Sequence, residues 1–71
     1  MQSSKTTMTI AINLKTIRTK LGYTQSNLAE KADMNPNAYA KIERGERRAN
    51  TDTLEKICKA LKVKSSDILP F

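Results

Sequence analysis

A short segment bounded by helix-start and helix-stop residues constrains the fold of this chain more than any other feature. Asn35 and Pro36 begin the segment, and Gly45 follows it. An asparagine side chain caps free backbone N–H groups, and proline suits the first helical position, where an N–H has no intrahelical partner. Glycine ends helices because it adopts left-handed backbone conformations without strain. We therefore predict a helix over residues 36–44.

Four other segments carry apolar residues every three or four positions, which is typical of helices that bury one face. Thr24, Asn50 and Ser65 are suitable caps for the second, fourth and fifth helices. Asp33 tolerates a left-handed conformation, which suits the turn between the second and third helices. The predicted helices cover residues 10–21, 25–32, 36–44, 51–61 and 66–69. This pattern predicts an all-α fold whose second and third helices form a helix-turn-helix arrangement.

The chain divides into a short polar segment and one domain. Residues 1–9 are rich in serine and threonine and lack helical periodicity, so we expect a flexible N-terminal arm. Residues 10–71 contain all the predicted helices. A chain of 71 residues hides only about 60% of its unfolded surface, and it has no room for a separate catalytic domain.

The composition is basic, with 13 lysine and arginine residues against 7 aspartate and glutamate residues and a net charge of +6. This excess favours nucleic acid or an anionic membrane surface as a partner, although basic charge also serves solubility. No apolar run is long enough to span a membrane, and residues 1–10 lack the apolar core of a secretory signal. The sequence therefore predicts a cytoplasmic protein with no membrane partner.

Residues suited to catalysis or to metal binding are scarce. Histidine is absent and Cys58 is the single cysteine, so the chain has neither an internal disulfide nor a thiolate cluster for zinc. Cys58 belongs to the apolar stripe of the helix over residues 51–61, where a buried, unreactive thiol is expected. The sequence also lacks a nucleophile–base pair and a glycine-rich phosphate loop. We expect no enzymatic activity, no metal and no cofactor.

The helix over residues 36–44 has two contrasting faces at 100° per residue. Tyr39 and Ile42 lie on one side, where they suit a core. Asn37, Lys41 and Arg44 lie on the opposite side at i, i+4 and i+7. Any surface helix shows polar residues opposite an apolar stripe, but a helix also fits the DNA major groove, where amides and cations bind base edges and phosphates.

Further polar and basic residues flank this helix. Thr24 and Gln25 begin the preceding helix, whose N-terminal N–H groups favour an anion such as phosphate. Arg47 and Arg48 follow the third helix, where the backbone of a bound duplex would run. Contacts of this kind supply affinity with little sequence information.

Three pieces of the chain, "LGYTQSNLAEKA", "IERGERR" and "TLEKICKALKV", occur in an order and spacing that resemble the Cro/phage-repressor (XRE-type) helix-turn-helix family. The resemblance covers roughly residues 10–69. The compact length and "IERGERR" are also similar to the controller proteins of restriction–modification systems. The resemblance implies a compact five-helix, lambda-repressor-like domain with a DNA-binding unit at about residues 24–32 and 36–44. It also implies a sequence-specific transcriptional regulator.

The resemblance assigns roles to individual residues. Asn37 and Lys41 fall on base-reading positions of the recognition helix, and Gln25 matches a residue that meets phosphate. Arg18 and Glu43 match a structural pair that joins the first and third helices in many relatives. The phosphate-binding set expected from position and resemblance together is Thr24, Gln25, Arg44, Arg47 and Arg48.

The sequence departs from the family pattern at two positions. Asp33 stands where the family usually has glycine, which places strain on the turn. Pro36 occupies a position from which many relatives send a polar side chain to a base. Because that contact is impossible here, no relative's target sequence can be assumed for this chain.

Family members usually bind inverted repeats as symmetric dimers, with half-sites about one helical turn apart. The apolar residues Ile68, Leu69 and Phe71 at the C-terminal end suit a homodimer interface or a cover for the core. Double-stranded DNA and a second copy are the expected partners, and RNA polymerase is a further partner if the protein activates transcription. The alternatives are a DNA-binding antitoxin and a protein-interaction module that keeps the fold.

Overall fold

A computed structural model describes residues 5–69 of the chain, and the predicted all-α class is confirmed within them. The elements are α1 (Lys5–Lys20), α2 (Gln25–Lys31), α3 (Pro36–Glu43), α4 (Thr51–Leu61) and the 3-10 turn η1 (Ser65–Asp67). The prediction of five helices is not confirmed, because the last segment forms only this 3-10 turn. Pro70 follows directly after residue 69, and a proline disfavours the helical conformation of the residue before it.

The first helix begins at Lys5 instead of at Ile10. Residues 5–9, which were expected in the arm, therefore form the first turns of α1, and residues 1–4 lie outside the described part. Threonines in this stretch have modest helix propensity, which hides the helix in the sequence. The Thr9 hydroxyl donates a hydrogen bond to the carbonyl oxygen of Lys5 at 3.0 Å, so its polarity is satisfied within the helix.

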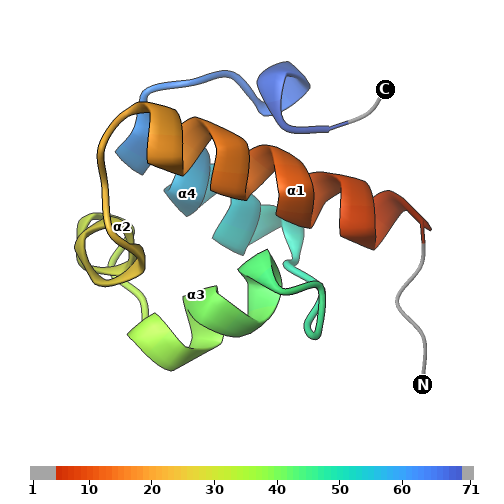
Figure 1. Cartoon of the computed structure of the whole chain (residues 1–71), viewed down its shortest axis with the longest axis horizontal. Helices are drawn as coiled ribbons and strands as arrows, with labels where there is room; N and C mark the ends of the chain where they lie inside the picture. Colours follow the sequence, from red (N-terminus) through yellow and green to blue (C-terminus); the bar gives the residue numbers. More distant parts are fainter. Residues whose placement is uncertain (1–4, 70–71) are drawn as a thin grey trace.

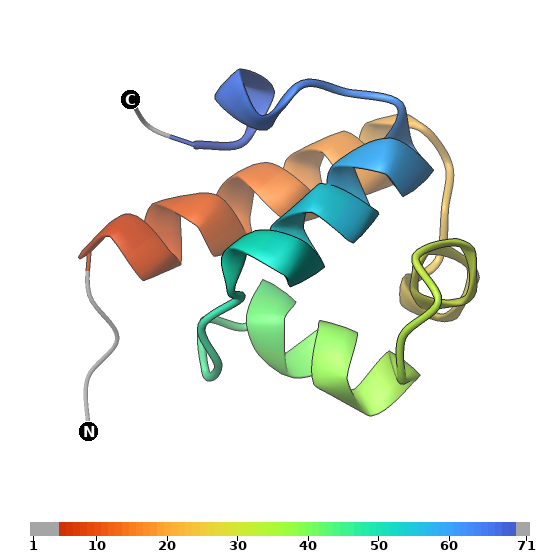
Figure 2. The same ribbon diagram turned by 180° about the vertical axis from the view of Figure 1, so that it is seen from behind.

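The helices surround one core, with α3 along one edge of α1 and α4 and α2 at one end of them (Figures 1 and 2). α2 contacts both α3 and α4, and η1 contacts α4. The C-terminal segment runs along the opposite edge of α1 and α4 from α3 (Figure 1). The core contains side chains from every element or its flank, namely Leu14, Leu28, Ala29, Ala32, Tyr39, Ile42, Ile57, Cys58, Leu61 and Ile68.

The core of α2 and α4 matches the predicted apolar stripes. Leu28, Ala29 and Ala32 are all buried, and the two alanines allow close approach of a neighbouring helix. Cys58 is also buried, and desolvation, followed by the influence of Asp67, raises the pKa of its thiol. The expected role of Cys58 as a small core residue is therefore confirmed.

No helix within residues 5–69 has the length and apolar character needed to cross a membrane.

Candidate nucleic-acid interface

The N-caps of α2 and α3 and the turn between these helices have the local geometry that the sequence predicts. The Thr24 hydroxyl accepts a hydrogen bond from the Asn27 backbone N–H at 3.0 Å, and the Asn35 side chain accepts one from the Asn37 N–H at 2.8 Å. Asp33 is left-handed, with a φ of 55°. The N–H groups of Asp33 and of the next residue donate back to carbonyls of α2, so Asp33 performs the role that glycine usually has after a helix.

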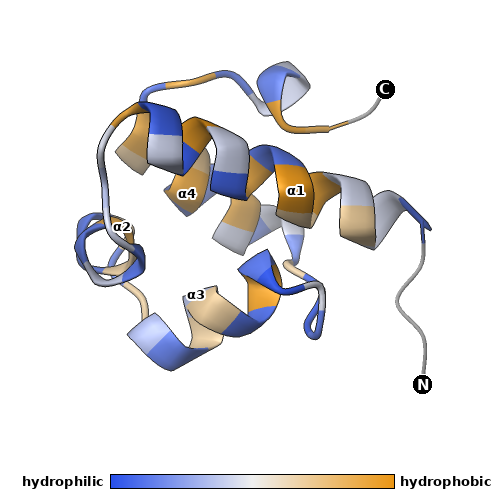
Figure 3. Ribbon diagram, viewed as in Figure 1, coloured by the Kyte–Doolittle hydropathy of each residue, from blue (hydrophilic) through white to orange (hydrophobic). Residues whose placement is uncertain are grey.

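α3 exposes the face that was predicted to be polar and buries the opposite one. Tyr39 is completely buried and Ile42 is nearly so, whereas Asn37 and Lys41 are exposed. Figure 3 shows hydrophilic and hydrophobic residues alternating along α3 and hydrophilic residues filling the loop that follows it. The helix is therefore fixed from one side and accessible from the other.

A buried ion pair joins the end of α3 to α1. Arg18 donates from Nε to Glu43 Oε2 and from Nη2 to Glu43 Oε1, both at 2.8 Å. A third Arg18 group, Nη1, donates to the Tyr23 carbonyl oxygen at 2.7 Å. Because the guanidinium engages the carboxylate with two parallel hydrogen bonds, the pair fixes both distance and direction between the helices.

Gln25 belongs to the same network. Its side-chain Nε2 donates to Glu43 Oε1 at 3.1 Å, so the residue expected at phosphate is also bound inside the protein. Burial acts to raise the pKa of Glu43, but hydrogen bonds, with that of Arg18 the strongest, hold this pKa below its usual range. Glu43 is thus a charged structural anchor, which agrees with its expected place in a structural pair with Arg18.

The hydroxyl of Tyr39 lies beside this hydrogen-bond network without taking part in it. It is buried close to Glu43, and it has no hydrogen-bond partner among residues 5–69. Burial, and next the neighbouring carboxylate, raise the pKa of Tyr39 far above its usual range. The Tyr39 hydroxyl therefore stays protonated at neutral pH and adds no charge to the site.

The basic residues after α3 differ in their surroundings. Arg44 forms an exposed ion pair with Glu46, with Nε and Oε2 separated by 2.6 Å. Arg47 and Arg48 are exposed, and both line a small hollow against the first turns of α1 at Thr6. Of the expected phosphate-binding arginines, Arg44 is thus engaged with a carboxylate, whereas Arg47 and Arg48 lie open at the rim of the hollow.

The C-terminal residues do not all have the position expected of an interface. Ile68 is completely buried in the core of its own chain, so its expected place in a dimer interface is wrong. Its carbonyl oxygen accepts a hydrogen bond from the Asn13 side chain at 2.7 Å, which holds this segment on α1. Leu69 is half-buried, and Phe71 lies outside the described residues.

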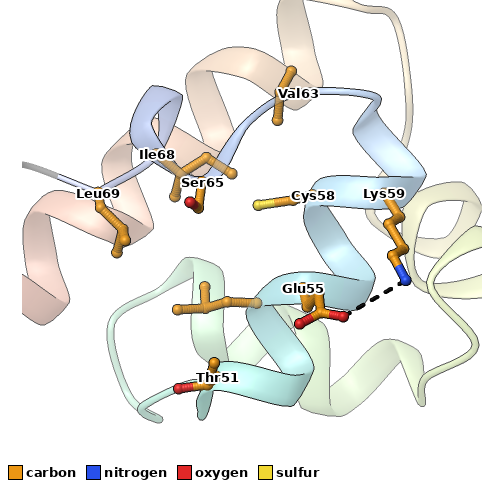
Figure 4. A pocket seen from close by; sticks show the side chains of 9 residues that line it. Thr51, Glu55, Cys58, Lys59, Val63, Ser65, Ile68 and Leu69 are labelled. Atoms are coloured by element: carbon orange, nitrogen blue, oxygen red, sulfur yellow. Dashed lines mark ion pairs between the residues drawn. The ribbon is translucent and has the colours of Figure 1, made fainter.

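A groove of about 400 Å³ separates α4 from the C-terminal segment (Figure 4). Leu54, Cys58, Val63 and Leu69 supply apolar groups to its lining. The ion pair between Glu55 and Lys59, 3.6 Å apart, lies at one side of it. This groove was not predicted from the sequence, because it depends on where the chain turns after α4.

Residues 14–68 match the Helix-turn-helix family model HTH_3, which covers most of the chain. The chain belongs to the helix-turn-helix DNA-binding family of the Cro/phage-repressor (XRE) type. Members of this family are non-enzymatic DNA-binding transcription regulators. The expected family and its DNA-binding character are therefore confirmed. Among curated proteins, none matches the sequence significantly.

Several solved structures are similar to this protein. The restriction–modification controller protein C.Esp1396I is 32% identical, with 89% of this chain and 82% of that chain covered and a TM-score of 0.84. The controller protein C.AhdI from Aeromonas hydrophila is 22% identical, with 89% and 96% covered and a TM-score of 0.86. The clp gene regulator ClgR from Corynebacterium glutamicum is 24% identical, with 94% and 71% covered and a TM-score of 0.86.

Two polar contacts of the site were not foreseen from the sequence. The bond between Gln25 and Glu43 joins residues 18 positions apart, and only the angle between α2 and α3 brings them together. The pair between Arg44 and Glu46 is local, and the spacing of opposite charges around Gly45 was a usable signal for it.

Proposed function

We propose that this protein regulates transcription by binding an inverted-repeat operator as a homodimer, with α3 of each copy in the major groove. The observation that carries the proposal is the contrast between the two faces of α3. Tyr39, Ile42 and Glu43 fix the helix from inside, while Asn37 and Lys41 project from the other face. A short helix held in this way presents a rigid set of donors to base edges.

Asn37 and Lys41 are the proposed base-reading residues. They lie one helical turn apart, so both reach the same groove. An amide pairs well with adenine, and an ammonium donates to guanine acceptors. Pro36 at the tip of α3 has no donor to offer. We therefore expect DNA shape to supply part of the specificity.

The proposed phosphate contacts come from residues beside α3. The Thr24 hydroxyl accepts from Asn27, so its own O–H is available as a donor. The Gln25 amide uses one N–H for Glu43 and retains a second. Arg47 and Arg48 are exposed cations, and Arg44 becomes available when it exchanges Glu46 for a phosphate.

The proposed dimer interface lies on the C-terminal side of α4. Leu69 and the apolar groove replace Ile68 in this role, and Phe71 stays a prediction. The similar protein C.Esp1396I has been observed as a tetramer on its natural 35 base-pair operator. Assembly of several copies on one operator is therefore a known behaviour of a close structural relative, and it supports the homodimer proposed here.

Selection from random duplex DNA tests the proposed function. The protein is incubated with a random pool at low salt, and the bound duplexes are sequenced. We expect an inverted repeat whose half-site centres lie about one helical turn apart. Absence of any enriched sequence would exclude a sequence-specific regulator, and enrichment of a single unrepeated site would exclude the dimer.

Two alanine variants test the division between base and phosphate contacts. Lys41→Ala should relax the preference at one position of the selected half-site. Arg47→Ala should weaken binding to all duplexes and lower the slope of log affinity against log salt by about one unit. Equal effects of both variants on preference and on slope would contradict the assigned roles.

A further inference from the structure

The carboxylate of Glu43 is shared by two other helices. Its Oε1 accepts hydrogen bonds from Arg18 of α1 at 2.8 Å and from Gln25 of α2 at 3.1 Å. Its Oε2 accepts the second Arg18 bond. The Glu43 side chain is only 2% exposed, so water does not replace a lost partner easily. One carboxylate at the end of α3 therefore ties α1, α2 and α3 together.

Gln25 holds a particular place in this arrangement. It is the first residue of α2, and within residues 5–69 no other side-chain hydrogen bond joins α2 to α3. The two helices also pack together in the core, where Leu28 and Ala29 of α2 belong to the same cluster as Tyr39 of α3. The Gln25 amide adds a contact that depends on direction as well as distance, so it constrains the angle between α2 and α3.

A small change of this angle has a large effect at the far end of α3. Asn37 lies six residues from Glu43, about 9 Å along a helix that rises about 1.5 Å per residue. A tilt of about 10° about Glu43 would move Asn37 by about 1.5 Å, about half the length of a hydrogen bond. The same tilt would move Lys41 by only about 0.5 Å.

We infer that Gln25 is a positioning residue for α3, which sets the base contact of Asn37 through its hydrogen bond to Glu43. The inference rests on the proposed function, since it assumes that α3 contacts bases. It goes beyond a phosphate contact, because a phosphate contact alone would change affinity for all duplexes equally. The second N–H of the same amide remains available to phosphate, so binding of DNA would further fix the amide on Glu43.

The test compares three variants on the duplex selected by the wild-type protein and on a scrambled duplex. Gln25→Met keeps the length of the side chain and removes the donors. Gln25→Lys retains a donor that reaches Glu43. Arg47→Gln serves as the reference for a lost phosphate contact. Circular dichroism and thermal melting establish that each variant folds.

We expect Gln25→Met to lower the ratio of specific to non-specific affinity by about tenfold, the size of effect expected when one base contact is weakened. The loss should fall mainly on the base pair whose preference Asn37→Ala abolishes, and less on that of Lys41→Ala. Gln25→Lys should restore the ratio. A uniform loss of affinity in Gln25→Met, as in Arg47→Gln, would overturn the inference while leaving the proposed function intact.

A measurement without DNA distinguishes failure of the positioning role of Gln25 from failure of the proposed function. Hydrogen bonding by Gln25 contributes to the low pKa of Glu43, so the carboxyl carbon of Glu43 should titrate at higher pH in Gln25→Met. In Gln25→Lys it should titrate no higher than in the wild-type protein, because the ammonium favours the ionised carboxylate. Residual dipolar couplings should show a changed angle between α2 and α3 only in Gln25→Met. If the wild-type protein selects no sequence, the proposed function fails, and unchanged couplings would overturn the positioning role by themselves.

Discussion

Two neighbouring residues, Glu43 and Arg44, take part in ion pairs that are similar in length and different in consequence. The pair between Arg18 and Glu43 spans 2.8 Å, with side chains 13% and 2% exposed. The pair between Arg44 and Glu46 spans 2.6 Å, with side chains 53% and 54% exposed. The first joins two helices that are distant in sequence, whereas the second joins residues two positions apart.

The comparison shows that burial, and not distance, decides what an ion pair does. Both partners of the exposed pair keep much of their hydration, so breaking it costs little. The Arg18–Glu43 pair has lost most of that hydration, so either partner left alone would be a largely buried charge with only the hydrogen bonds to Tyr23 or Gln25 to compensate it. At the end of α3, Glu43 thus fixes the helix to the core, whereas the next residue, Arg44, is an exposed cation that can exchange partners.

The largest expected effect is that of removing the buried carboxylate. Glu43→Ala leaves the Arg18 guanidinium unpaired, and the free energy of unfolding should fall by about 3–5 kcal/mol. For a domain of this size that is a large part of the total stability. Urea unfolding followed by circular dichroism measures the change.

The matched control removes both charges. Arg18→Met combined with Glu43→Leu replaces the pair by apolar groups of similar size, and it should recover much of the stability lost in Glu43→Ala. A double variant as unstable as the single one would show that the unpaired charge of Arg18 does not dominate the loss in Glu43→Ala.

Acid should produce a smaller loss through the same group. Because the pKa of Glu43 is lower in the folded protein than its ordinary value, its stabilising contribution is present above that ordinary value. The contribution is lost as the pH falls below about 4.5 and through the folded pKa. Thermal melts between pH 7 and pH 2 measure it.

Glu43→Gln tests whether this loss of stability at low pH originates at Glu43. The variant cannot take up a proton at residue 43, so its stability should depend less on pH in this range than that of the wild-type protein. Glu46→Gln makes the same change of charge at an exposed site, and its stability should still decrease at low pH almost as much as that of the wild-type protein. Equal slopes for Glu43→Gln and the wild-type protein would contradict the assignment.

The buried side of α3 and its ion pair with Arg18 were more predictable from the sequence than the exposed pair between Arg44 and Glu46. Helical spacing predicted the inward positions of Tyr39 and Ile42, and the family resemblance identified the partner of Glu43. Cap residues such as Asn35 predicted the start of α3 because capping is local chemistry. The start of α1 was missed because the threonines of residues 5–9 resemble a polar arm.

Tertiary geometry accounts for what could not be predicted. No sequence pattern places Gln25 on Glu43, since the contact depends on the crossing of α2 and α3. The burial of Ile68 likewise depends on the chain turning back onto α1, where Asn13 holds its carbonyl. Apolar residues near a chain end suit a core and an interface equally well, so only the fold separates Ile68 from Leu69.

Tyr39→Phe should have a smaller effect on stability than either change at Glu43. The hydroxyl that it removes has no hydrogen-bond partner within residues 5–69, so the free energy of unfolding at pH 7 should change by less than about 1 kcal/mol. A larger loss, measured by urea unfolding, would show that the hydroxyl donates to Glu43 in solution.

Alkaline pH gives an independent measure of the same side chain. The pKa of Tyr39 is raised in the folded protein, so its contribution is present below the ordinary value of 10.0 and is lost as the pH rises above it. Tyr39→Phe should lack this part of the alkaline loss. Tyr23→Phe is the matched control, because Tyr23 is only half-buried.

The smallest expected effect on stability belongs to the exposed pair between Arg44 and Glu46. Breaking this pair should change the affinity for DNA instead. Glu46→Gln removes the partner of Arg44 without removing any buried group, so the melting temperature should stay unchanged. Freed from the carboxylate, Arg44 is available to phosphate, and one negative charge leaves the interface. Affinity for both selected and scrambled duplexes should therefore rise several-fold at low salt, and the gain should shrink as salt increases.

In the Arg44→Gln background the same substitution should give a smaller gain, because only the repulsion between Glu46 and phosphate remains to be removed. A lower melting temperature in Glu46→Gln, or equal gains in both backgrounds, would break the distinction between an anchoring pair and an exchangeable one.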